Sequence, residues 1–158
     1  MIMRKILIGN ELLIIFFRIA GATFGIDIQN VVSVLDNTNV RKVPLAPEYM
    51  NSIRSCHGEI LTIFDIKTYF KYKDTVSASE KKIIYLNHPR LHTGILVDKV
   101  INIDYVLQSY IEPIPDENTA TAEAGFCKEM FVLQEDEPGI YRLDTKLIET
   151  FVDGLDLS

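Results

Sequence analysis

The chain has 158 residues, 47% of them hydrophobic and 24% charged, which suits one compact domain or two small subdomains that share a core, and excludes a disordered or fibrous protein. Its formal net charge is −6 and its basic residues are scattered, so nucleic acid is not an expected partner. The cysteines, Cys56 and Cys127, form neither a disulfide framework nor a CxxC motif, which favours a reducing, cytoplasmic setting.

The N-terminal stretch MIMRKILIGNELLIIFFRIAG begins like a signal peptide, because Arg4 and Lys5 precede apolar residues. However, the polar stretch at 9–11 interrupts the first apolar run, and Arg18 closes the second. Spanning a bilayer takes about 20 apolar residues. We therefore expect a soluble protein without direct membrane insertion.

Most of the following chain consists of short apolar runs between turn signals, a pattern typical of a barrel or sandwich. Gly21-Ala22 is expected to form a tight hairpin turn, since glycine adopts a positive φ at little steric cost. Segments 36–39 and 116–123 are expected loops. The expected strands cover residues 12–20, 23–28, 31–35, 40–43, 58–64, 82–86, 92–97, 101–106, 130–133 and 139–143.

Helical signals are few and short. The segment APEYMNSI at 46–53 has Pro47 at a favourable first helical position, so a short helix is expected there. The polar segment 71–82 contains few large apolar residues and is an expected surface loop between the two halves of the chain.

Two similar phrases lie in opposite halves of the chain: GEILTIFDIKTYF at 58–70 and GIYRLDTKLIETF at 139–151. Each contains an apolar strand, an aspartate and then a helical turn that ends in an aromatic residue. Asp65 and Asp144 are expected helix N-caps, because a carboxylate there accepts bonds from the free N–H groups of the first turn. The repeat is loose, and it leaves open whether the chain contains a duplicated unit.

Cys56 and His57 stand side by side and raise the hypothesis of a Cys/His enzyme. In extended backbone their side chains point to opposite faces, whereas a nucleophile and its base must converge. We therefore interpret Cys56 as a small buried residue and His57 as an exposed one. His88 and His92 have a metal-ligand spacing only on a helix, which Pro89 opposes, so no metal is expected.

The sequence contains no phosphate-binding GxxxxGK[ST] or GxGxxG motif. A nucleic-acid-binding barrel, the other alternative, has only one cluster of aromatic and basic residues to support it, at 69–73. What remains is a surplus of apolar residues at 12–17 and 31–35, too many for strands with one wet face. Either both faces are covered inside the fold, or one meets another protein, which favours a protein-binding module.

Three phrases, in order, resemble the CheW-like chemotaxis coupling proteins. FRIAGATFGIDIQNVVSVL at 17–35 is similar to the family's opening hairpin, and VRKVPLAPEYMNSIRSCHGEILTIFDIKTYF at 40–70 to its run of a proline, an Asn-Leu-Arg-Gly turn, a strand and an Asp-Leu-Arg corner. GILVDKVINIDYVLQSYIEPIP at 94–115 resembles the Gly-h-h-Val-Asp-x-Val phrase, where h is apolar. The likeness extends over 12–151, with 1–11 as an N-terminal extension.

The resemblance implies a mainly β fold with few short helices: one domain of two intertwined, five-stranded, SH3-like β-barrels around a shared core. It also implies an adaptor without catalytic activity or cofactor, which joins the cytoplasmic helical hairpin of chemoreceptors to the regulatory domain of a sensor histidine kinase. The same fold in another signalling or surface-motility kinase pathway is the alternative. Either adaptor would be cytoplasmic and recruited to membrane receptor arrays.

The resemblance also assigns residues. His57 stands where the family has a partner-contacting arginine, and Ser33 where an acidic residue is common. The residues expected to bind partners are Asp27, Val31, Val34, Arg54, His57, Gly58, Val97 and Val100; those expected to be structural are Gly25, Asp65, Gly94, Asp98 and Asp144.

Overall fold

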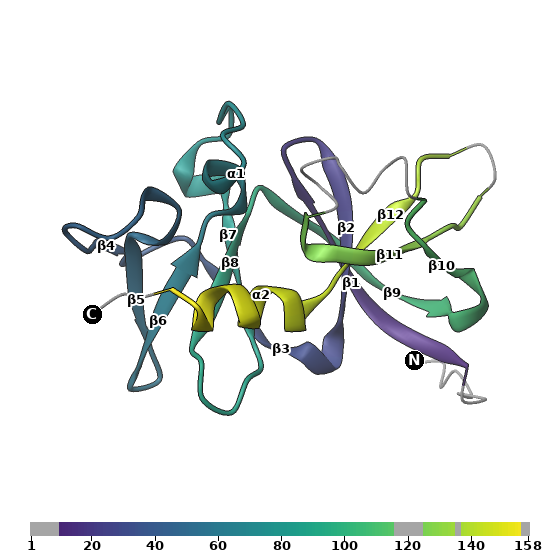
Figure 1. Ribbon diagram of the computed structural model, residues 1–158, viewed down its shortest axis with the longest axis horizontal. Coiled ribbons are helices and arrows are strands. Elements are labelled where there is room, and N and C mark those ends of the chain that lie inside the picture. The colour runs from purple at the N-terminus through teal and green to yellow at the C-terminus, as the bar shows by residue number, and fades with distance from the viewer. Residues whose placement is uncertain (1–9, 116–124, 135–136, 156–158) are drawn as a thin grey trace, which may run out of the picture.

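The computed structural model describes residues 10–115, 125–134 and 137–155, and these form two six-stranded β-sheets (Figure 1). Sheet 1 contains β1 (Glu11–Ile19), β2 (Ala22–Asp27), β9 (Lys99–Leu107), β10 (Ile111–Pro113), β11 (Cys127–Phe131) and β12 (Ile140–Leu143). Sheet 2 contains β3 (Val31–Asp36), β4 (Arg41–Lys42), β5 (Ser52–Cys56), β6 (Glu59–Phe64), β7 (Lys82–Leu86) and β8 (Thr93–Val97). The α-helices are α1 (Ile66–Tyr69) and α2 (Thr145–Asp153), with 3₁₀ turns at Ile28–Asn30, Glu48–Met50, Ala78–Glu80 and Gln108–Tyr110.

The two sheets have the same topology. Sheet 1 has the order β9-β1-β2-β12-β11-β10 and sheet 2 the order β3-β7-β8-β6-β5-β4. In each, one parallel pair, β2 with β12 or β8 with β6, stands among antiparallel pairs. The duplication that the repeated phrases left open is therefore present in the strand order.

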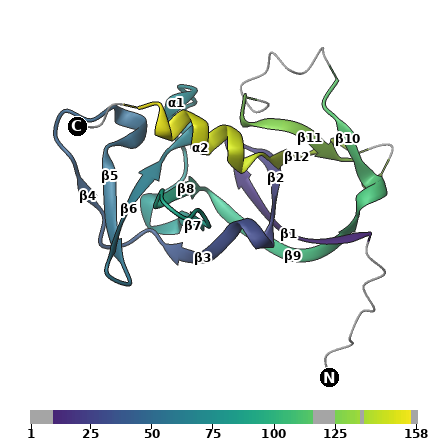
Figure 2. The same ribbon diagram turned by 60° about the horizontal axis from the view of Figure 1, so that its bottom comes forward.

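The chain builds the second copy of this unit from both of its ends. Sheet 2 uses the contiguous strands β3 to β8, whereas sheet 1 uses β9 to β12 and completes itself with the N-terminal hairpin β1–β2. In Figure 2, α2 then crosses from sheet 1 and lies against sheet 2. The two halves are thus intertwined along the sequence.

Both strand-to-helix corners are N-capped as expected. Asp65 accepts a hydrogen bond from Thr68 N (3.1 Å), and Asp144 accepts bonds from Lys146 N (2.9 Å) and Leu147 N (3.3 Å). The carboxylates satisfy N–H groups that a first helical turn leaves free. The equivalent aspartates therefore end β6 and β12 in the same way.

The buried residues form one shared cluster and one cluster inside each sheet. The shared cluster takes residues from both sheets and from α2, among them Phe17, Phe24, Phe64, Ile95, Phe126 and Ile148. The cluster within sheet 2 contains Cys56, Leu61, Ile63, Ile83 and Tyr85, and that within sheet 1 contains Ile14, Phe16, Val106 and Phe131. This arrangement confirms the mainly β fold with a shared core.

Gly25 and Gly94 occupy equivalent positions in the two sheets. Each faces the buried cluster that lies within its own sheet, which we call the private cluster of that sheet. Gly25 pairs with Arg142 of β12, and Gly94 with Ile63 of β6, two residues before the capping aspartate in each case. A Cβ on Gly25 would lie 2.7 Å from Ile14, and one on Gly94 would lie 2.5 Å from Ile83. Both glycines allow side chains of the neighbouring strand to pack against bare backbone, which agrees with a structural role.

Several expected boundaries are wrong. The expected helix at 46–53 is only a 3₁₀ turn at Glu48–Met50, because the following residues pair as β5 with β6. β10 is missed because a strand of three residues is too short to show periodicity. β10 and β4 are the short edge strands of sheet 1 and sheet 2, and they bring each sheet to six strands where five were implied. β11 begins at Cys127, three residues earlier than expected, because Cys127 pairs with Leu143.

The first hairpin turn is also shifted by one residue. Ala20 (φ 52°) and Gly21 (φ 83°) form the turn, while Ala22 already belongs to β2. Two successive positive φ values are typical of the type I′ turn that joins antiparallel strands. The expected loop at 116–123 and most of the extension at 1–11 lie outside the described residues.

Candidate protein-binding surface

Two equivalent edge strands, β3 and β9, carry exposed apolar residues. Along β3, Val31 and Leu35 turn inward against buried clusters, while Val32 and Val34 turn outward. Val34 is expected from the sequence, and its side chain is accessible to a partner. The apolar surplus at 31–35 is therefore divided between the core and the surface.

The exposed apolar residues on β9 are Ile101, Ile103 and Tyr105. Ile103 and Tyr105 are two residues apart and share a face, whereas Ile101 lies at a bulge where the pairing of β9 with β1 shifts. Together with Val32 and Val34, these three residues are 36–53% exposed. We call these five residues the edge-strand rows. The sequence analysis assigned β9 as a strand but missed its row, because alternation alone does not show which face lies outside.

The other apolar surplus, at 12–17, is covered inside the fold. Ile14 and Phe16 face the private cluster of sheet 1, whereas Ile15 and Phe17 face the shared cluster. β1 is a central strand between β2 and β9, which explains why it is apolar on both faces. Its central residues 14–17 therefore belong to the core, while Leu12 and Leu13 are half-buried.

Three further residues expected to bind partners lie deeper than a contact surface. Val97 is buried in the shared cluster at 1% exposure, so its side chain lies in the core and not on a surface. Val31 and Val100 are half-buried and pack against the same cluster. The side chains of Val31 and Val100 therefore pack the edge strands β3 and β9 against the shared cluster.

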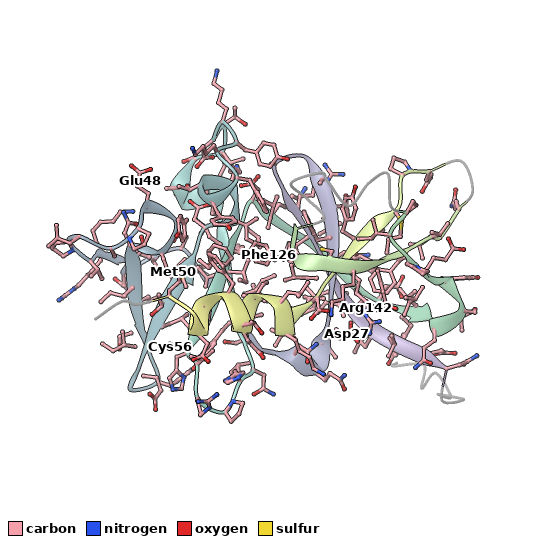
Figure 3. The ribbon with its side chains drawn as sticks, in the orientation of Figure 1. Asp27, Glu48, Met50, Cys56, Phe126 and Arg142 are labelled. Carbon is pink, nitrogen blue, oxygen red and sulfur yellow. The ribbon has the colours of Figure 1, made fainter. Side chains whose placement is uncertain are left out.

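Asp27 is also buried, and Arg142 is its partner. Arg142 donates from Nε to Asp27 Oδ1 (3.0 Å) and from Nη2 to Oδ2 (2.6 Å), so the pair is bidentate (Figure 3). A third bond from Nη1 reaches Glu129 (3.0 Å). Hydrogen bonding to Asp27 raises the pKa of Arg142 despite burial. Asp27 thus links the N-terminal hairpin to β12. Arg142 was missed as its partner, because no local pattern joins residues this far apart in the chain.

His57 and Gly58 form the two-residue turn between β5 and β6. Their φ values are 49° and 82°, again typical of a type I′ turn. The assumption of extended backbone at His57 is therefore wrong, since a type I′ turn has positive φ at both central positions. Its side chain is nevertheless exposed, as expected, and Cys56 is buried.

Arg54 lies on β5 beside this turn. Its Nη1 donates to the carbonyl oxygen of Asp36 (2.5 Å), at the end of β3. The half-buried guanidinium therefore links β5 to the edge strand β3.

The described residues offer no site for a metal ion, because none of their His, Cys, Asp and Glu side chains form a group of three suited to one. His88 and His92 are held apart: His88 accepts bonds at Nδ1 from the N–H groups of Arg90 and Leu91, and His92 Nδ1 lies 2.9 Å from Tyr85 Oη. Burial raises the pKa of the Cys127 thiol to about 12, so it is not a nucleophile at neutral pH.

Among the described parts of the chain, no helix is long and apolar enough to cross a membrane.

Comparison with known proteins agrees with this architecture. The family model for the CheW-like domain matches residues 13–148. The chemotaxis protein CheW of Klebsiella aerogenes is 26% identical over 109 residues, 69% of this chain and 64% of that protein. The chemotaxis protein CheW of Treponema pallidum is 24% identical over 106 residues, 65% of this chain and 62% of that protein. The match thus spans less than two thirds of these relatives.

A solved structure shares the fold. The crystal structure of the scaffolding protein TtCheW from Thermoanaerobacter tengcongensis superposes with a TM-score of 0.72 at 24% sequence identity, covering 84% of this chain and 88% of that one. Because the family model covers most of the chain, including both sheets, the chain belongs to the CheW-like domain family.

Proposed function

We propose that this protein is a cytoplasmic, non-enzymatic adaptor that couples the cytoplasmic tips of chemoreceptors to a sensor histidine kinase. Membership of the CheW-like family and relatives named as chemotaxis proteins support it. The observation that carries it is the pair of edge-strand rows, since exposed apolar residues gathered on two equivalent strands are typical of a protein-binding surface.

The edge-strand rows are the proposed receptor contact. A receptor hairpin presents the apolar side of an amphipathic helix, which apolar side chains at regular spacing can accept. Val34 supplies an accessible contact on β3, while Val31 and Val100 hold the strands in place. The valine and isoleucine side chains are stiff, so little side-chain entropy is lost on binding.

The β5–β6 turn is the proposed kinase contact. His57 and Gly58 are exposed at its tip, and Arg54 fixes β5 against the end of β3. His57 occupies the position of the family's partner-contacting arginine. The partner that binds this turn is therefore expected to accept an imidazole in place of a guanidinium.

Val34→Glu tests the receptor contact. The variant places a charge on the apolar row, and we expect receptor-hairpin binding to weaken by at least about tenfold, since burying an unpaired charge costs more than about 1.4 kcal/mol. Leu133→Glu is the matched control, because Leu133 is 41% exposed against 40% for Val34 but lies beyond β11 of sheet 1.

Binding is measured by titration calorimetry with a receptor tip fragment and with the kinase regulatory domain. Undiminished receptor binding by folded Val34→Glu would refute the contact. Failure of the unaltered protein to bind either partner would refute the proposed function. Affinity capture from cells then identifies the kinase and, through it, the pathway.

A further inference from the structure

The two sheets are joined by a link of one residue. β8 of sheet 2 ends at Val97 and β9 of sheet 1 begins at Lys99, so Asp98 alone stands between them. The edge-strand row on β9 starts directly after this link, and the row on β3 starts directly after the other strand-to-strand link, Ile28–Asn30. The angle between the sheets therefore determines how the two rows face a partner.

The Asp98 side chain is held from both sides of the link. From sheet 1, Asp98 Oδ2 accepts a hydrogen bond from Ala20 N in the β1–β2 turn (2.9 Å), and Asp98 N donates to Arg18 O (2.9 Å). From the sheet 2 side, the ammonium of Lys67 in α1 lies 2.6 Å from Asp98 Oδ1. One carboxylate thus bonds with both halves of the molecule.

Lys67 is unusually placed for a lysine. It is only 4% exposed, and lysine is almost never buried unless paired. Its second partner, Asp74 Oδ1, lies 3.0 Å away in the segment that follows α1. Hydrogen bonds to Asp98 and Asp74 raise its pKa although burial opposes this, so the ammonium stays charged at neutral pH.

The corresponding position in the repeated unit shows that folding of the corner does not require this pair. Lys146 follows the capping Asp144 by two residues, as Lys67 follows Asp65, and it is exposed. α2 forms without a buried ion pair at that position. The Lys67–Asp98 pair is therefore an addition to the corner, found where the corner meets the other sheet.

We propose that the Lys67–Asp98 ion pair is a latch that fixes the relative orientation of the two sheets, and that Lys67 is thereby a positioning residue for a partner that contacts both edge-strand rows. The latch itself follows from the contacts around Asp98. Its consequence for binding rests on the proposed function. A buried pair of this kind is suited to setting one geometry among several, because its strength depends on precise approach.

The chain supplies a matched control in Lys81. This lysine is 5% exposed and bonds with Asp74, on the sheet 2 side alone. Lys81→Met therefore removes an equally buried ammonium from its ion pair without cutting the link between sheets, although Asp74 is 44% exposed against 12% for Asp98. Lys67→Met cuts the link, and the double variant Lys67→Met/Asp98→Asn cuts it without leaving an unpaired buried charge.

The direct readout is the set of residual dipolar couplings of backbone amides, which report how each sheet is oriented. In the unaltered protein and in Lys81→Met, we expect the couplings of both sheets to fit one alignment tensor. In Lys67→Met and in the double variant, the couplings of each sheet still fit the structure of that sheet, but the alignment tensors obtained from the two sheets differ. A double variant whose sheets share the unaltered tensor, or one that fails to fold, overturns the latch.

Receptor-tip binding is the second readout. If about one tenth of the unlatched molecules have the binding orientation at any moment, affinity falls about tenfold, whereas Lys81→Met binds as the unaltered protein does. Equal affinities for all variants would remove the positioning role. Should Val34→Glu show that the receptor does not bind here, the proposed function fails, and the dipolar couplings still decide the latch.

Discussion

Asp74 is the residue whose ionisation links this network to pH. Although burial alone would raise its pKa, hydrogen bonds from Lys81, Lys67 and Val76 N hold the pKa at about 2, against an ordinary value of 3.8. A carboxyl whose pKa is lower in the folded state stabilises the fold above its unfolded pKa and loses that contribution as pH falls through the folded one. The loss is therefore expected between about pH 4 and pH 2.

Asp74→Asn removes this part of the pH dependence. The side chain is 44% exposed, so solvent screening reduces the contribution to about 1 kcal/mol. Urea unfolding at several pH values should show the variant less stable by this amount above pH 4, with the two proteins converging near pH 2. A difference that stays constant down to pH 2 would contradict the assignment of the pH dependence to Asp74.

Single residues also show the limit of reading this site from sequence. Only the family resemblance places Val34 at a partner surface, and the exposure expected for His57 follows from extended backbone, which the β5–β6 turn contradicts. The partners Asp27–Arg142 and Lys67–Asp98 are 115 and 31 positions apart (142 − 27 and 98 − 67), and no local pattern joins them. Burial of Val97 likewise depends on packing between the sheets, and Asp27 is buried beside Arg142 of the distant strand β12.

At the scale of elements, Gly94 tests why β8 can pack against its neighbours. Gly94→Ala places a Cβ 2.5 Å from Ile83 and 3.0 Å from Leu61, both fully buried in the private cluster of sheet 2. We expect a loss of roughly 1–3 kcal/mol in the free energy of unfolding, typical of overpacking in a tight core.

The control is Gly154→Ala at the end of α2. There φ is −78°, and the nearest atom to a Cβ is 3.4 Å away, so stability should change by less than about 0.5 kcal/mol. Equal effects at the two glycines, measured by urea unfolding, would mean that close packing is not the reason for glycine at position 94.

Elements with a strong local signal could be predicted, and those defined by pairing could not. The capping aspartates fix α1 and α2 because the signal lies within a few residues. The helix expected at 46–53 overlaps the first two residues of β5, Ser52 and Ile53, and only their pairing with β6 makes them part of a strand. The short strand β10 is likewise defined only by its pairing with β11.

For the whole molecule, the resemblance carried more information than periodicity did. Ten apolar runs indicate a barrel or sandwich, but their order does not tell that β1–β2 completes sheet 1 while β3 to β8 form sheet 2. The family resemblance implied two intertwined barrels with a shared core, and the structure supplies the strand order. The shared cluster contains buried residues from both sheets and from α2, so the two halves have one continuous core between them.

The last prediction concerns that shared cluster. Phe126, labelled in Figure 3, directly precedes β11 of sheet 1. Its ring packs edge-to-face on Phe64 of sheet 2 with the ring centroids 5.4 Å apart, and the centroid of Phe151 in α2 lies 5.6 Å away. Because both sheets bury residues here, we expect them to unfold in one cooperative transition. Phe126→Ala should lower stability by about 3–5 kcal/mol, through lost burial and the cavity left behind.

Hydrogen exchange followed by mass spectrometry separates this from independent unfolding. In Phe126→Ala, the slowest amides of β1 and β2 and those of β7 and β8 should lose protection by the same factor, because the shared cluster couples the sheets. Phe16→Ala is the second variant, because Phe16 belongs to the private cluster of sheet 1 and not to the shared cluster. If the two sheets unfold cooperatively, this variant also lowers the protection of amides in both sheets. Loss confined to the mutated sheet in both variants would show that the halves unfold separately, and that the intertwined chain does not make them one unit.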